Sequence, residues 1–174
     1  MPLYDSTPFP GKTIYFGSQV VGKTLDKTFE IRELGNDTLK VSLDTPVLTG
    51  HQDDFSVGTA FPIDIVDGDN PATITVHCHP TRGGLRTATL NLMSNDASNL
   101  KITYTLNCRG KAAGYNSTPF SSGDTLDFGK KPVGQTLNKT FEIQEIGDAD
   151  LTVDLATTAI SGNESKDFEI ISPT

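Results

Sequence analysis

The sequence predicts an all-β fold, an antiparallel sandwich of two sheets that is present once in full and once in part. Three observations lead to this fold class. Apolar and polar residues alternate with period two along most of the 174 residues, apolar residues with helical spacing are nearly absent, and a domain-sized unit begins a second time. A chain of this length has room for two domains of about 85–110 residues.

The repetition can be followed in the printed sequence. Three stretches of the first 57 residues recur about 111–112 positions later: YDSTPFPGKTIYFG (4–17) as YNSTPFSSGDTLDFG (115–129), VGKTLDKTFEIRELGNDTLKVSL (21–43) as VGQTLNKTFEIQEIGDADLTVDL (133–155), and LTGHQDDFSV (48–57) as ISGNESKDFEI (160–170). A period of this length is that of a whole domain, because solenoid units are only 20–45 residues long.

The period sets the expected domain organisation. We expect a complete sandwich over 1–110, a linker of small residues over 111–114, and the first half of a second repeat over 115–174, because residues 71–109 have no counterpart in the second copy. Half a sandwich exposes an apolar face and unpaired sheet edges. Either the polypeptide is a fragment of a longer array, or strands of a neighbouring chain complete the second repeat, which would build a filament.

The strands of the first repeat are predicted from their alternation and from the turn clusters between them. About seven strands at roughly 8–14-residue spacing, each with one polar face, are typical of an immunoglobulin-like antiparallel sandwich. At the strand ends, Leu34 and either Leu85 or Thr87 are expected to point inward. The other expected inward residues are Ile14, Phe16, Leu25, Phe29, Ile31, Leu39, Val41, Leu43, Ile74, Val76, Cys78, Leu90, Leu92, Ile102, Tyr104, Leu106 and Cys108.

Two stretches carry a family resemblance. IYFGSQVVGKTLDKTFEIRELGNDTLKVSL (14–43) resembles the opening of bacterial choice-of-anchor D repeats, which are similar to the ASH/Hydin-like and major-sperm-protein-like immunoglobulin folds. ATITVHCHPTRGGLRTATLNLMSNDASNLKITYTLNCRG (72–110) resembles their second half, with a strand ending before Pro, a Gly turn, TATL, SND, and a last strand ending in Gly. The resemblance covers essentially the whole chain, and it implies mostly non-catalytic parts of exported, surface or scaffold proteins.

Cys78 and Cys108 close two strands that are expected to run the same way, and both share the parity of core residues. If those strands belong to opposite sheets, the side chains can meet at the Cα separation of about 4.4–6.8 Å that a disulfide needs. Two reduced, buried cysteines are the alternative. In the family that the chain resembles, cysteines placed as VxCxP and LxCxG are typical of exported members, which implies the Cys78–Cys108 disulfide. Such a bond persists in oxidising compartments.

His77 and His79 have the opposite parity to Cys78, so we expect them on the outer face of their strand. Two histidines at this spacing can chelate zinc or copper, but a useful site needs a third or fourth ligand. The only other histidine, His51, lies in a loop. We therefore expect a solvated strand face, no metal and no cofactor, with His77 and His79 as the candidate ligands of the alternative.

Acidic turns occur at 51–54, 67–70, 94–96 and 147–150, and each is interpreted as an Asx turn. Calcium needs six to eight oxygen ligands, more than one such turn supplies. Four sequons, at Asn36, Asn116, Asn138 and Asn163, matter only in a eukaryotic secretory pathway.

Composition excludes several classes of function. A formal charge of −8 and a pI near 4.7 disfavour nucleic acid and anionic membranes. No apolar run approaches the roughly 18–20 residues of a membrane span, and residues 1–12 lack the apolar core of a signal peptide, so any targeting segment is expected to be absent from this chain. No nucleophile elbow, phosphate loop or HExxH motif is present, and we expect no enzyme.

The predicted function is that of a non-catalytic structural or adhesive module of an extracellular or cell-surface repeat array, with the periplasm as a further location. Its expected partner is protein, either through self-association of the incomplete second repeat or through neighbouring repeats of the array. The alternatives are an intracellular ASH-like scaffold module that binds a protein partner, and an accessory ligand-binding module of a larger secreted protein.

Overall fold

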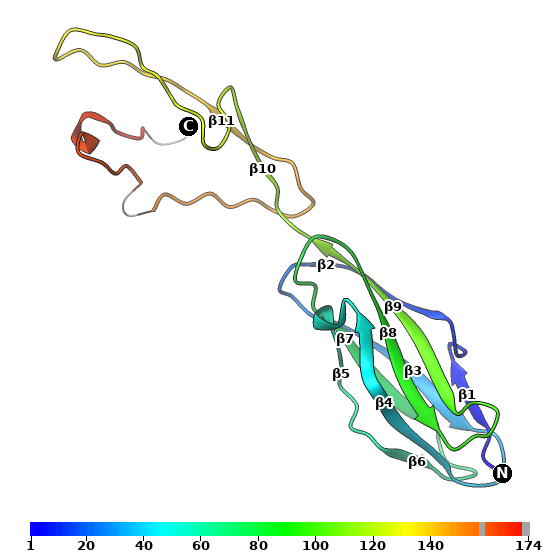
Figure 1. Cartoon of the computed structure of the whole chain (residues 1–174). Coiled ribbons are helices and arrows are strands. Elements are labelled where there is room, and N and C mark those ends of the chain that lie inside the picture. Colours follow the sequence, from blue (N-terminus) through cyan, green and yellow to red (C-terminus); the bar gives the residue numbers. More distant parts are fainter. Residues whose placement is uncertain (157–158, 172–174) are drawn as a thin grey trace.

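The computed structural model describes residues 1–156 and 159–171 (Figure 1). The sandwich is built from β1 (Tyr4–Thr7), β2 (Thr13–Val20), β3 (Leu25–Glu33), β4 (Leu39–Gly50), β5 (Phe55–Val57), β6 (Ile63–Ile65), β7 (Ala72–Cys78), β8 (Gly84–Ser94) and β9 (Lys101–Lys111). The described residues further form β10 (Tyr115–Thr118), β11 (Glu142–Glu145) and two 3-10 turns, η1 (Gln52–Asp54) and η2 (Ser165–Asp167). None of the described helical segments is long and apolar enough to cross a membrane.

The sandwich has two layers. One sheet has the strand order β1-β3-β7-β5 and the other has the order β2-β9-β8-β4-β6. Neighbouring strands are antiparallel except for β2, which runs parallel to β9. The chain crosses between the layers in the segment 8–12, so that β1 and β2 belong to opposite sheets (Figure 1). The predicted all-β, immunoglobulin-like sandwich is confirmed, while alternation alone predicted neither β1 nor the parallel pair.

The core lies between the two layers and follows the predicted alternation of apolar residues. In the described part of the chain, the buried residues of the hydrophobic core cluster all come from residues 4–108. Two expected positions were wrong. Leu34 is exposed because β3 ends one residue earlier, and Leu85 is exposed because it has the opposite parity to Leu90 on β8.

The inward position at the start of β8 belongs to Arg86, neither to Leu85 nor to Thr87. Arg86 has the parity of Ala88 and Leu90, which are buried. An arginine on a strand usually indicates the solvent side, and sequence reasoning therefore missed it. The reason for its inward position is a buried carboxylate, Asp54, which lies 32 positions earlier in the chain.

Among residues 115–156 and 159–171, the second repeat keeps one strand pairing of the first, and this pairing is internal to its own half. β10 pairs with β11 from Tyr115↔Glu145 to Thr118↔Glu142, the same register that joins β1 to β3 from Tyr4↔Glu33 to Thr7↔Glu30. We expected further strands, up to residue 171, but the described residues of the repeat form none. The physical reason is the loss of partner strands: in the first repeat, β2 pairs with β9, β5 and the Leu25–Ile31 part of β3 pair with β7, and β4 pairs with β6 and β8.

Candidate functional site

The cross-sheet disulfide fastens one end of the sandwich. Cys78 ends β7 in one sheet and Cys108 lies near the end of β9 in the other, and their sulfur atoms are bonded at 2.09 Å with a Cα separation of 6.5 Å. Both side chains are buried. The structure thus contains the pairing that the sequence predicts, and the reduced alternative does not apply to it.

A buried carboxylate fastens the same end. Asp54, 1% exposed, accepts hydrogen bonds from the Thr81 amide at 2.6 Å, from the Thr81 hydroxyl at 2.7 Å and from Nε of Arg86 at 2.6 Å. Burial by itself raises the pKa of Asp54, but these three donors and the guanidinium charge outweigh burial and hold that pKa below its ordinary value. This carboxylate joins the η1 turn to the β7–β8 turn.

A second buried polar cluster, of three hydroxyl groups, ties β1 of one sheet to β9 of the other. The Tyr104 hydroxyl lies 2.7 Å from the hydroxyl of Tyr4 and 2.6 Å from that of Ser6. Burial raises the pKa of both tyrosines, so both hydroxyls remain protonated donors at neutral pH. The Tyr4 amide in turn donates to Asp96 at 2.9 Å, so that the SND turn closes over the start of β1.

The three histidines contact different groups. Nδ1 of His77 lies 2.7 Å from Asp26 on β3, the backbone amide of His79 donates to the carbonyl of Asp54, and Nδ1 of His51 accepts from the Thr87 amide. Within residues 1–156 and 159–171, no three His, Cys, Asp or Glu side chains are grouped to hold a metal ion. His77 lies on the less buried parity of β7, opposite Cys78, and His79 follows the end of β7 and is also only partly buried.

The second repeat presents an open apolar face. Phe141 and Ile143 are 50% and 42% exposed, whereas their counterparts in the first repeat, Phe29 and Ile31, are 3% and 0% exposed. Tyr104 of β9 covers Phe29 at a ring-centroid distance of 4.8 Å. Residues 71–109 have no counterpart in the second copy. The second copy therefore has no equivalent of Tyr104 to cover Phe141.

These features define the class: an immunoglobulin-like sandwich with a cross-sheet disulfide, followed by a partial copy of itself. No protein-family model and no curated protein matches the chain. Among solved structures, the chain is similar to the ASH/PapD-like domain 7 of human CEP192, with 10% identity, coverage of 62% of this chain and 84% of that chain, and a TM-score of 0.43.

Two further similarities concern proteins of different kinds. WR4, a member of the MSP family from C. elegans, is 9% identical over 60% of this chain and 96% of that chain, with a TM-score of 0.37. The VesB protease of Vibrio cholerae is 14% identical over 62% of this chain but only 31% of that chain, with a TM-score of 0.43. At these identities and TM-scores, the likeness says nothing about activity or partners.

Proposed function

We propose that this chain is a non-catalytic structural module of an exported, surface-located repeat array of the choice-of-anchor D kind. In this proposal the first repeat is a stable spacer, and the open face of the second repeat is covered by β-strands of a neighbouring chain. The observation that carries the proposal is the contrast between equivalent residues, since Phe141 and Ile143 are exposed where Phe29 and Ile31 are buried.

The Cys78–Cys108 disulfide supports the exported location. A disulfide such as Cys78–Cys108 persists in oxidising compartments, whereas cysteine thiols are kept reduced in the cytosol. An intracellular scaffold module is the competing function, and it requires two free thiols. Intact mass measured without reductant on protein from its native source distinguishes the two: we expect a mass lower by two hydrogens, and the mass of the fully reduced chain would contradict export.

The open face supports the proposed partner. In the first repeat, strands β7, β8 and β9 supply the cover, and all three are held there by the core and the disulfide. They are therefore not available to a second copy. The face of the second repeat must take strands from elsewhere, and the first repeat indicates which pattern fits: an inward apolar residue at every second position, as in β7 and β9.

A self-completed chain tests this proposal. Because Ile170 is the counterpart of Val57, residues 58–110 are appended after Ile170, with Cys78→Ala and Cys108→Ala in the added copy to prevent disulfide exchange. We expect the original chain to sediment with a concentration-dependent mass and to bind an apolar dye, and the extended chain to be monomeric with weak dye binding. A matched extension carrying Leu90→Asp and Leu106→Asp should not cover the face and should behave as the original chain does.

The outcome that would overturn the proposal is an original chain that is monomeric at every concentration and gains no strand content on extension. An accessory metal-binding role makes a separate prediction, since it rests on His77 and His79. Zinc affinity that falls in His77→Ala would favour that role over the structural one.

A further inference from the structure

Residues 112–114, which lead from β9 into the second repeat, are hydrogen-bonded to a short segment of that repeat. We call residues 145–148 the linker socket of the second repeat. The amides of Ile146 and Asp148 donate to the carbonyls of Gly114 and Ala112 at 3.1 and 3.0 Å. In the other direction, the amide of Gly114 donates to Glu145 and that of Ala112 to the Asp148 carboxylate, both at 2.8 Å. The linker is thereby bound along its backbone and is not a free tether.

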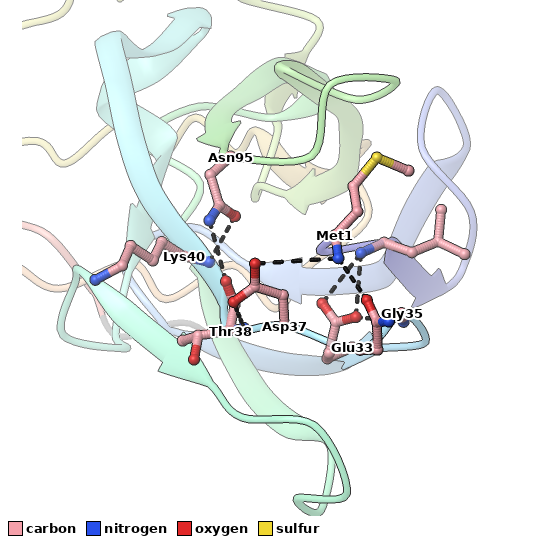
Figure 2. Close-up of polar contacts among 9 residues, drawn as sticks. Met1, Glu33, Gly35, Asp37, Thr38, Lys40 and Asn95 are labelled. Carbon is pink, nitrogen blue, oxygen red and sulfur yellow. Dashed lines mark hydrogen bonds and ion pairs between the residues drawn. The ribbon is translucent and has the colours of Figure 1, made fainter.

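The first repeat has the same socket at residues 33–36, and it holds the segment Met1–Leu3 (Figure 2). The amides of Leu34 and Asn36 donate to the carbonyls of Leu3 and Met1 at 3.0 and 3.3 Å. The amide of Leu3 donates to Glu33 at 3.1 Å, and the Met1 amine donates to Asn36. All four contacts recur at the equivalent positions of the second repeat, although Ala112 and Gly114 share no side chain with Met1 and Leu3.

A glycine in each socket makes room for the incoming backbone. A Cβ atom added at Gly35 would overlap the carbonyl oxygen of Met1, and one added at Gly147 would overlap that of Ala112. The amides of these glycines also donate to Glu33 and Glu145, respectively. The socket therefore consists of a Glu, a Gly two positions later and an Asn or Asp after it, and it recognises a main chain in preference to any side-chain sequence.

The socket of the second repeat also contacts the domain that precedes it. Strand β9 ends at Lys111, directly before Ala112, and Arg109 on that strand lies 3.5 Å from the Asp148 carboxylate. Asp148 thus accepts from the linker and pairs with the last strand of the first repeat. The counterpart of Asp148 in the first repeat is the neutral Asn36, which accepts a hydrogen bond from the Met1 amine.

We propose that the linker socket is a joint between consecutive domains. It binds the extended segment that leaves the last strand of one domain, and it thereby holds the next domain in one orientation. The partner that it fits is the end of a β9-type strand of another domain of this kind, in the same polypeptide. The joint is independent of what covers the open face, because none of its contacts involves that face.

Nuclear magnetic resonance on the isotope-labelled 174-residue chain tests the joint. We expect amides of β9 and of β10–β11 to share one alignment tensor in residual dipolar couplings, and the amides of Ile146 and Asp148 to exchange slowly with solvent. Gly147→Ala should separate the two halves into two tensors. Gly35→Ala is the matched variant: it displaces Met1–Leu3 and should leave the single tensor unchanged.

Cross-strand contacts between Ser117 and Ile143 verify that β10–β11 remains paired in each variant. If Gly147→Ala loses this pairing, Asp148→Ala and its control Asp150→Ala, which removes the same charge two positions later, decide the question: only the first should separate the tensors. Two tensors in the original chain, rapid exchange at Ile146, or one tensor in Asp148→Ala would each overturn the proposal.

Discussion

The ring of Phe128 lies 5.7 Å from the ring of Phe168, and the same distance separates their counterparts in the first repeat, Phe16 and Phe55. The interplanar angles, 57° and 62°, also agree. Phe16 is on β2 and Phe55 on β5, so in the first repeat this contact joins the two layers. The second repeat thus brings the counterparts of Phe16 and Phe55 together in the same way, although neither Phe128 nor Phe168 lies in a strand.

Removing the open apolar face should reduce association without affecting the first repeat. In the double variant Phe141→Asp and Ile143→Asp, we expect lower apolar-dye fluorescence and a smaller sedimenting mass, with an unchanged unfolding temperature of the first repeat in calorimetry. Phe9→Asp is the control, because Phe9 is an exposed aromatic residue of the first repeat. An equal fall of dye binding in the control would contradict the assignment of the face to the second repeat.

The disulfide should stabilise the first repeat measurably. Cys78 and Cys108 are 30 positions apart, and opening a loop of that size costs roughly 3 kcal/mol on the chain-entropy account. We expect Cys78→Ala with Cys108→Ala to lower the free energy of unfolding in urea by about that amount. Wild-type protein unfolded in the presence of a reductant should behave as the double variant does, and equal stability of all three samples would be evidence against a closed bond in solution.

The buried Asp54 should be the most sensitive carboxylate of the first repeat. Replacement by Ala leaves Arg86 and the Thr81 amide without their acceptor, and breaking a buried pair of this kind typically costs about 3–5 kcal/mol. We expect Asp54→Ala to lower the free energy of unfolding by roughly 3 kcal/mol in urea titrations. Asp53→Ala is the neighbouring control, since Asp53 is exposed, and it should change stability by less than about 0.5 kcal/mol.

Stability should fall on acidification. Donors hold the pKa of Asp54 and that of Asp96 below their ordinary values, so the unfolded chain takes up protons at these carboxyls before the native chain does. The stabilisation is complete above the ordinary carboxyl pKa of about 4 and is lost as the pH falls through the lower native pKa. Urea titrations between pH 7 and pH 2 should show a shallower decline in Asp54→Asn with Asp96→Asn, and an unaltered slope would refute the assignment.

The Tyr104 hydroxyl should contribute to stability through its two partners, Tyr4 and Ser6. Tyr104→Phe leaves both hydroxyls in the core with one partner fewer, and a lost buried hydrogen bond typically costs about 1–3 kcal/mol. We expect a decrease near the lower end in thermal or urea unfolding, because Ser6 retains the Pro8 carbonyl. Tyr15→Phe, on an exposed ring, is the control and should have no effect.

Predictions that depend on neighbours along the chain were largely correct. The alternation of residues such as Ile74, Val76 and Cys78 predicted an inward face, because successive side chains of a strand point to opposite sides. The short β1 was missed even though YDST is repeated as YNST, a signal that could have indicated a strand. Leu85 and Leu34 were placed inward wrongly, because parity changes wherever a strand begins or ends.

What the sequence determined by itself is the class of fold, the repetition and the parity of the two cysteines, since each depends on spacing along one strand. The tertiary structure alone decided which distant groups meet: Arg86 with Asp54, Tyr4 with Tyr104, and the linker residue Ala112 with Asp148. These contacts join elements separated by 32 to 100 positions, and the register and layer of each strand bring them together. For the same reason the described residues of the second repeat form only the pair β10–β11, because the other strands need partners of the β7–β9 kind.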